Sequence, residues 1–173
     1  MKEIRLTQGE VALIDDGDSE LVSKYKWCAM KQRNTFVAKR GIRVDKKHRT
    51  IYMHNFIMGY KNCFEIDHIN HNGLDNRRAN LRRVTKAQNQ YNKQPKHGCS
   101  SKYKGVTFER KSDMWQAQIQ YKGINKYLGK YSTPEEAALV YNKAAIKKFG
   151  EYAFLNKVIL PCWPGECADF IAF

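Results

Sequence analysis

The sequence lacks the paired cysteines from which small proteins build zinc sites or disulfide frameworks. Its five cysteines, at positions 28, 63, 99, 162 and 167, form no C-x-x-C pair and follow no regular spacing. Cys162 and Cys167 could join a zinc site only if two further ligands came from elsewhere in the chain. We therefore expect free thiols in a reducing compartment and no structural zinc.

Long apolar runs and acidic side chains are also scarce. No stretch approaches the roughly 20 apolar residues of a transmembrane helix, and Met1–Arg5 lacks the apolar core of a secretion signal. We expect no membrane association and a cytoplasmic location. Only 17 acids stand against 31 Lys and Arg, which gives a formal net charge of +14. This excess predicts an anionic partner, with nucleic acid as the default and a membrane surface as the rival.

Apolar and aromatic residues are plentiful enough for a globular chain of the α+β class. Hydrophobic residues make up 42% of the sequence, with ten Tyr, eight Phe and three Trp. A polar stretch with Pro, Gly and Ser at 94–102 predicts a linker. We expect a first domain at 1–93, a second at 103–157, and an apolar tail of unassigned role at 158–173.

The first domain begins with the pattern of a small antiparallel sheet. Strands are expected at 4–6, 10–14, 27–30, 36–39 and 50–53. Asp16–Ser19 can cap a helix that continues to about Lys26. The segment Lys39–Arg49 holds six cations and one acid. It is either a solvated hairpin tip or a phosphate contact, and the charge of the chain favours the second.

Residues 64–92 predict a strand, a long loop, a second strand and a helix. The first strand, at 64–66, places Asp67 and His68 at its end. The turn formers Asn72-Gly73 and Asp75-Asn76 follow. The return strand is expected at 81–84, and Thr85 can cap a helix to about Asn92.

This arrangement predicts metal-assisted attack on a phosphodiester. Asp67 supplies a carboxylate and Asn89 an amide oxygen, and Mg²⁺ prefers such ligands together with water and phosphate. His68 points to the other side of the strand because successive side chains alternate, and a neutral imidazole can deprotonate water. Asn80 could hold the long loop and orient the His68 ring. Mg²⁺ or Mn²⁺ is the expected cofactor.

A group of arginines follows the turn, with no acid among residues 76–86. We expect some of them to contact DNA phosphates, and a solvated surface is the alternative. The candidates are Arg77, Arg78, Arg82 and Arg83.

The segment resembles the HNH endonucleases, whose core is the ββα-metal fold, and in particular their phage and intron-associated homing branch. The resemblance rests on Ile66–Asn70, Gly73–Arg77 and Asn80–Thr85 with Asn89. It implies that Asp67 and Asn89 are metal ligands, that His68 is the general base, and that Asn80 is the middle Asn of the motif. It also implies 5′-phosphate and 3′-hydroxyl products.

The sequence departs from that family at two places. His54 matches an upstream His of many relatives, but Asn55 stands where they usually have Arg. We interpret His54 as structural rather than catalytic. The chain also lacks the paired cysteines of zinc-stapled relatives, so apolar packing is expected to hold the core.

The second domain predicts three antiparallel strands and one covering helix. Strands are expected at 103–109, 115–121 and 125–131. In the second strand, Ala117 and Ile119 share one face while Gln118 and Gln120 share the other. The helix starts at the N-cap Thr133 with a capping box, presents Ala138, Tyr141, Ala145 and Phe149 to the sheet, and ends at Gly150.

This pattern resembles the Apetala-two/ethylene-response-factor DNA-binding domain of plants. The resemblance rests on Tyr103–Val106, Trp115–Ile119, Tyr127–Tyr131, Glu135–Ala138, Tyr141–Ala145 and Phe154–Asn156. It implies that the exposed sheet face enters the major groove, and the alternative is a merely polar surface. The implied DNA-binding residues are Lys104, Thr107, Gln118, Gln120, Asn125 and Tyr127, with Arg110 and Lys111 of the first turn.

The sequence as a whole predicts a site-recognising, divalent-metal-dependent DNA endonuclease. The partner is double-stranded DNA, bound by a monomer or a homodimer in a bacterial or phage-infected cell. The rivals are a DNA-binding transcriptional regulator with an inactive nuclease domain and an RNA-processing nuclease. The intact set of Asp67, His68, Asn80 and Asn89 argues against the regulator.

Overall fold

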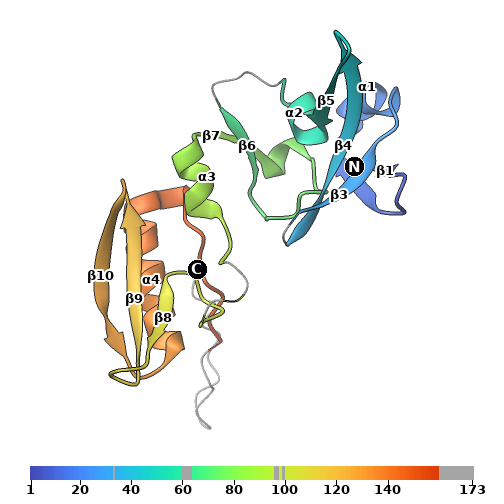
Figure 1. Cartoon of the computed structure of the whole chain (residues 1–173). Coiled ribbons are helices and arrows are strands. Elements are labelled where there is room, and N and C mark those ends of the chain that lie inside the picture. The colour runs from blue at the N-terminus through green and yellow to red at the C-terminus, as the bar shows by residue number, and fades with distance from the viewer. Residues whose placement is uncertain (33, 60–63, 96–97, 99, 160–173) are drawn as a thin grey trace. The chain divides into compact units, whose positions relative to one another are not determined.

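The computed structural model describes residues 1–32, 34–59, 64–95, 98 and 100–159. It forms two compact units, Met1–Gln90 and Tyr91–Phe173. Most of the predicted tail, and positions 96, 97 and 99 of the predicted linker, lie outside the described residues. The predicted α+β class is confirmed: helices accompany small antiparallel sheets in both units (Figure 1).

The first unit contains three small sheets. Its strands are β1 (Lys2–Arg5), β2 (Val11–Ile14), β3 (Cys28–Gln32), β4 (Thr35–Val44), β5 (Lys47–Tyr52), β6 (Glu65–His68) and β7 (Leu81–Val84). The strands pair as β1-β2, β3-β4-β5 and β6-β7, and all pairs are antiparallel. Its helical segments are η1 (Asp16–Asp18), α1 (Ser19–Ser23), α2 (Met53–Ile57), η2 (Arg78–Asn80) and α3 (Lys86–Asn92), which crosses into the second unit.

The core of the first unit joins these pieces through apolar side chains from most of its elements. Ile14, Val22, Trp27 and Met53 are at most 1% exposed. The Trp27 indole N–H donates to the Val22 carbonyl at 3.0 Å. The only polar atom of the Trp27 side chain is therefore satisfied, and the ring adds its full area to the core.

Two boundaries in the first unit differ from the sequence prediction. Helix α1 ends at Ser23 rather than Lys26, because Tyr25 leaves the helix to pack edge-on against Phe56. Strands β4 and β5 run through the basic segment predicted as a tip and leave only Asp45 and Lys46 as the turn. Backbone pairing needs no apolar face, so hydrophobic alternation did not reveal this extension.

The second unit is a three-stranded sheet covered by one helix, as predicted (Figure 1). Its elements are β8 (Val106–Glu109), β9 (Met114–Tyr121), β10 (Ile124–Tyr131), α4 (Pro134–Phe149) and η3 (Gly150–Tyr152). The strand order is β10-β9-β8. The predicted core positions Ala138, Tyr141, Ala145 and Phe149 are all buried on α4.

The first strand of this sheet begins three residues later than predicted. Gly105 has φ +75°, which breaks the extended backbone before β8. A Cβ at Gly105 would lie 2.1 Å from Cδ2 of the Tyr141 ring. Glycine is therefore required where α4 approaches the start of the sheet.

Candidate nuclease site

The β6-β7 hairpin fixes which site residues share a face. Its register pairs Glu65 with Val84, Asp67 with Arg82, and His68 with Leu81. Because side chains alternate along a strand, Glu65 and Asp67 lie on one face and His68 on the other. The opposition of Asp67 and His68 follows from this alternation.

Two carboxylates and one amide make up the first face. Asp67 accepts hydrogen bonds from Arg82 at 3.1 Å (Nε) and 3.0 Å (Nη2), and the two side chains are only 11% and 15% exposed. On α3, the Asn89 amide nitrogen donates to Glu65 at 2.5 Å. Asn89 therefore reaches the strand face that carries Asp67, through the carboxylate of Glu65, which was not among the predicted site residues.

This face has the chemistry of a site for a hard divalent cation. Carboxylate and amide oxygens suit Mg²⁺ and Mn²⁺. The Asn89 nitrogen is turned to Glu65, so the amide oxygen is the end available to a cation. The part of the chain that the structure describes holds no cluster of three or more His, Cys, Asp or Glu side chains with metal-binding geometry. Asp67 and Asn89 could supply two oxygen ligands, and the remaining positions around such an ion would fall to water and substrate oxygens.

The second face presents His68 among buried polar groups. Its ring centroid lies 4.9 Å from that of His54, nearly perpendicular to it. Nε2 of His68 lies 3.4 Å from the Asn76 side-chain oxygen. Burial lowers the pKa of His68 below its ordinary value, against smaller raising effects of Asn76, Asp67 and Asp75. The imidazole is therefore neutral near neutral pH.

His54 is the most strongly perturbed titratable group at the site. Burial, and then the neighbouring His68, lower the pKa of His54 from 6.5 to about 3. Its ring stacks on Tyr52 with centroids 5.5 Å apart. Its Nδ1 is buried without a hydrogen-bond partner among the described atoms. A ring that stays neutral and packed in this way supports the position of His68.

Asparagine side chains tie the loop between β6 and β7. The Asn80 oxygen accepts from the Asn70 backbone N–H at 3.0 Å, and the Asn80 nitrogen donates to the Asp75 carbonyl at 2.8 Å. Asn80 was expected to orient the His68 ring. In the structure, the amide beside that ring belongs to Asn76, which is fully buried. No local pattern distinguishes Asn76 from other asparagines of the turn, whereas Glu65 could have been found from its two-residue spacing to Asp67.

The N-terminal hairpin also supports this loop. The Leu13 N–H donates to the Leu74 carbonyl, and the Asn76 N–H donates to the Leu13 carbonyl, both at 2.8 Å. From β4, the Thr35 hydroxyl accepts from the Gly73 N–H at 3.0 Å. Elements far apart in the sequence therefore shape the site.

The arginines predicted to contact phosphate have internal partners. Arg77 forms a bidentate pair with Asp75, with both nitrogen–oxygen distances 2.7 Å. Arg78 pairs with Asp18 at 2.8 Å and 2.6 Å. Arg83 donates to the Met58 carbonyl at 3.1 Å. The acids that neutralise the cluster lie outside residues 76–86, so the cluster is not an isolated cationic patch. DNA contact by these arginines stays a prediction.

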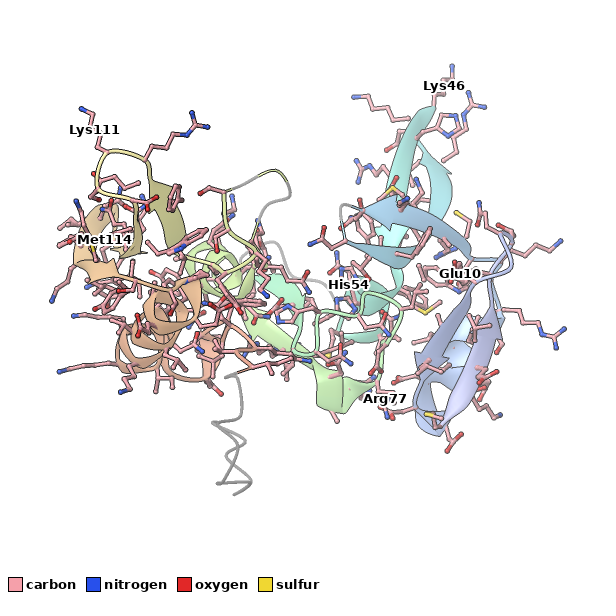
Figure 2. All side chains as sticks on the ribbon, turned by 90° about the horizontal axis from the view of Figure 1, so that it is seen from below. Glu10, Lys46, His54, Arg77, Lys111 and Met114 are labelled. Carbon is pink, nitrogen blue, oxygen red and sulfur yellow. The ribbon has the colours of Figure 1, made fainter. Side chains whose placement is uncertain are left out.

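The register of the three strands in the second unit places most of its predicted DNA-binding residues on one face of the sheet. Cross-strand pairs join Thr107 to Gln116, Gln118 to Tyr127, and Gln120 to Asn125. Arg110 and Lys111 are exposed at the β8–β9 turn, where Figure 2 labels Lys111.

Lys104 behaves differently from the other predicted contacts. Its ammonium donates to the Tyr91 and Lys93 carbonyls at 2.6 Å and 2.7 Å. Burial, and then Lys93, lower the pKa of Lys104 to about 8. The ammonium therefore serves the packing of the second unit.

Two predictions were drawn from composition, namely free thiols and no membrane association, and the described residues bear on each only in part. Cys28 is the one cysteine they include; it is a free thiol whose sulfur lies 3.3 Å from the Lys39 carbonyl. The other four cysteines lie outside the described residues. None of the described helices is long and apolar enough to cross a membrane.

Comparison with known proteins gives two kinds of similarity. The HNH endonuclease family model matches residues 45–91. An uncharacterized HNH endonuclease of Acanthamoeba polyphaga mimivirus is 33% identical over 159 residues, which cover 87% of this chain and 77% of the relative. No solved structure matches the chain.

Plant transcription factors match a shorter stretch. An AP2-like ethylene-responsive transcription factor of Arabidopsis thaliana is 43% identical over 60 residues, covering 35% of this chain and 12% of that protein. APETALA2-like protein 2 of Oryza sativa subsp. indica is 44% identical over 57 residues, covering 33% of this chain and 13% of that protein. The chain thus spans only a small part of these plant relatives. Given the extent of the viral match, the chain belongs to the HNH endonuclease family and joins to its nuclease an AP2-like segment.

Proposed function

We propose that this nuclease is a divalent-metal-dependent, site-recognising DNA endonuclease of the homing type, associated with a phage or an intron. The observation that carries the proposal is the hairpin-and-helix geometry around β6. One face of that strand offers Asp67 and, through Glu65, the helix residue Asn89. The other face offers a buried, neutral His68.

The chemistry assigned to the first face is charge stabilisation at phosphate. Asp67 and Asn89 would hold the cation, and Glu65 orients the Asn89 amide. A bound Mg²⁺ or Mn²⁺ supplies Lewis-acid stabilisation of the charge that develops at the scissile phosphate. Arg82 already pairs with Asp67, so it fixes the carboxylate in place before substrate arrives.

The assigned role of His68 is to take a proton from the attacking water. The Asn76 nitrogen donates to the Leu74 carbonyl at 3.1 Å, which turns its oxygen toward Nε2 of His68. An amide oxygen only accepts, so Nε2 carries the ring proton and Nδ1 carries the lone pair. Water attacks phosphorus and gives a proton to Nδ1. The bond between phosphorus and the 3′-oxygen breaks, and the leaving 3′-oxygen takes a proton from solvent water, which yields 5′-phosphate and 3′-hydroxyl ends.

Recognition of duplex DNA is assigned mainly to the second unit. Three glutamines and an asparagine share one exposed or half-exposed face of its sheet. Amide side chains pair with adenine edges in the major groove. A sheet cannot enter the deep, narrow major groove of A-form RNA, so this face favours DNA.

The decisive experiment measures cleavage of supercoiled plasmid with Mg²⁺, with Mn²⁺ and with chelator. We expect metal-dependent cleavage, and a loss of about 10²–10⁴-fold in the single-turnover rate for His68→Ala. Asp67→Asn should lose metal-dependent activity, whereas the control Asp113→Asn should keep it, because Asp113 is exposed in a turn with φ +54° that suits Asn.

Other outcomes would point to other functions. DNA binding without cleavage, with wild type and His68→Ala equally inactive, would indicate a regulator with an inactive nuclease. Preference for duplex RNA over duplex DNA in competition would indicate an RNA-processing enzyme.

A further inference from the structure

The longest hairpin of the first unit, formed by β4 and β5, extends beyond the part of the sheet in which β3 takes part. Strand β3 pairs with β4 only from Thr35 to Lys39. Beyond Lys39, β4 has β5 as its partner, through the rungs from Arg40 with Ile51 to Val44 with Lys47. The turn residues Asp45 and Lys46 have φ +51° and +61°, as in the tight two-residue turns that suit twisted hairpins. Residues 40–51 therefore form a two-stranded ribbon, called here the β4–β5 ribbon.

The root of this ribbon is anchored in the core. The Arg40 guanidinium lies 3.6 Å from the centroid of the Tyr25 ring. It also lies 5.2 Å from the Phe56 ring and 5.6 Å from the Trp27 ring. Trp27 is almost fully buried. An anchored root lets the ribbon keep one direction relative to its unit.

The outer part of the ribbon carries exposed cations. Residues 43–50 are all exposed. The ion pairs found among the described residues include none of Arg43, Lys47 and Arg49. Figure 2 shows Lys46 at the end of the ribbon, where nitrogen-tipped side chains gather. Asp45 is the one acid of this segment, so the ribbon is strongly cationic.

The register places these cations on both faces of the ribbon. Arg43 stands opposite His48 on one face. On the other face, Lys47 stands opposite Val44, and Arg49 stands opposite Ile42. A ribbon that lies flat on a polyanion needs cations on one face only. Cations on both faces suit a ribbon that stands between two walls of phosphate.

We propose that the β4–β5 ribbon inserts into the major groove of the duplex beside the nuclease site, and that Arg43, Lys47 and Arg49 contact phosphates on both walls. The major groove, about 12 Å wide, admits a two-stranded ribbon, whereas the minor groove is about half as wide. The inference rests on the proposed function, since it takes duplex DNA as the substrate.

The ribbon is also connected to the catalytic loop through its own strand. Thr35 of β4 accepts the Gly73 N–H, and Gly73 lies in the loop between β6 and β7. A duplex held by the ribbon is thereby placed relative to His68 by the first unit alone. This gives the nuclease unit a groove contact separate from the AP2-like sheet.

The test compares two triple variants of the full chain with equal loss of charge. One replaces the ribbon cations by Arg43→Gln, Lys47→Gln and Arg49→Gln. The control replaces three exposed cations outside the ribbon, by Lys2→Gln, Lys24→Gln and Lys26→Gln. The equilibrium binding constant for a duplex that wild type cuts is measured as a function of salt concentration. Each lost phosphate contact reduces the magnitude of the negative slope of log K against log salt by about 0.9. We therefore expect this magnitude to fall by about 2 to 3 for the ribbon variant and to stay almost unchanged for the control.

Dimethyl sulfate footprinting identifies the groove. Wild type should protect guanine N7, a major-groove atom, in a patch near the cut, and the ribbon variant should lose that patch. A variant with Gln118→Ala, Gln120→Ala and Asn125→Ala should keep the patch and lose a different one. Asp45→Asn with Lys46→Gly, which keeps a favoured turn and leaves Arg43, Lys47 and Arg49 in place, should preserve protection and show that it depends on those three cations.

Three results would overturn the inference. They are an unchanged salt slope in the ribbon variant, an equal fall in the control, and lost protection at adenine N3 of the minor groove. Failure of the proposed function looks different, because wild type itself would then fail to cut duplex DNA, whatever the ribbon contributes to binding.

Discussion

Gly73 is the residue at which the catalytic loop meets β4. A Cβ there would lie 2.5 Å from the Phe36 carbonyl oxygen and 2.6 Å from Val37 Cγ1. Neither neighbour can yield easily, because one is strand backbone and the other is a buried side chain. Gly73→Ala should therefore lower the free energy of unfolding of the first unit by about 1–3 kcal/mol, measured by urea denaturation.

Gly17 provides the matched control for that substitution. A Cβ at Gly17 meets nothing within 4 Å, and Gly17 has no positive φ. Gly17→Ala should change stability by no more than about 0.5 kcal/mol. Equal effects of the two substitutions would mean that the loop moves away from β4 without cost.

Asp75 gives the site a pH-dependent contribution to stability. It is 2% exposed and accepts hydrogen bonds from Arg77 and Asn70. The Arg77 hydrogen bond is the main cause that holds the pKa of Asp75 below its ordinary 3.8. A depressed carboxyl pKa stabilises the fold above the unfolded value, and this contribution is lost as pH falls through the folded value.

The pH prediction is tested with Asp75→Asn. The variant should unfold more easily than wild type at pH 6, because its amide cannot pair with the Arg77 charge. The difference in unfolding free energy should shrink as the pH falls below about 3.8. A difference that stays constant down to pH 2.5 would show that Asp75 acts through packing and not through its charge.

Site residues were predictable where local pattern decides their position. Strand alternation was sufficient to place Asp67 and His68 on opposite faces of β6. The partners of the arginines were not predictable, because Arg78 pairs with Asp18 across 60 residues of sequence. Nor was the Asn76 contact to His68, which depends on backbone bonds to β2. Such long-range contacts leave no periodic trace in the sequence.

At the scale of elements, α4 is the helix whose limits the sequence defines best. The Thr133 hydroxyl accepts from the Glu136 N–H at 3.2 Å, and Glu136 accepts in return from the Thr133 N–H. Thr133→Ala should lower the stability of the second unit by about 1 kcal/mol, while Thr133→Ser should retain most of it. The melting temperatures of the two variants, measured by thermal denaturation, are compared. Equal melting would show that Pro134 alone suffices to begin the helix.

Strands were less predictable than this helix. Ala117 and Ile119 of β9 are buried as their alternation predicted. The β4–β5 ribbon has no such signal, since its outer residues are exposed on both faces. Its length follows from backbone pairing and from the Asp45-Lys46 turn, and neither depends on apolar pattern. The sequence therefore located the charge correctly but underestimated the strands that carry it.

At the scale of the whole molecule, α3 contributes to both units. Its Asn89 donates to Glu65 in the first unit. Its Tyr91 belongs to the second unit, where the ring stacks on Phe149 with centroids 4.0 Å apart. Lys104 binds the Tyr91 carbonyl at the end of the same helix. Asn89, the candidate metal ligand, is therefore two residues from Tyr91, whose ring packs within the second unit.

This continuity predicts what removal of the second unit does. A fragment of residues 1–93 lacks Phe149 and Lys104, so the end of α3 loses its ring stack and the cation at its carbonyls. Fraying of that end should loosen Asn89. We expect the fragment to lose DNA affinity and also to cut more slowly in a single turnover at saturating enzyme.

The comparison is a full-length chain altered only on the sheet face, by Gln118→Ala, Gln120→Ala and Asn125→Ala. It keeps Phe149 and Lys104, so it should bind more weakly yet reach the wild-type single-turnover rate once saturated. If the fragment also reached the wild-type rate, α3 would hold Asn89 without help, and the second unit would serve recognition alone. If both fall in rate, the sheet face itself acts in the chemical step. Only slow cleavage by the fragment, with normal cleavage by the face variant, shows that the second unit supports Asn89 through α3.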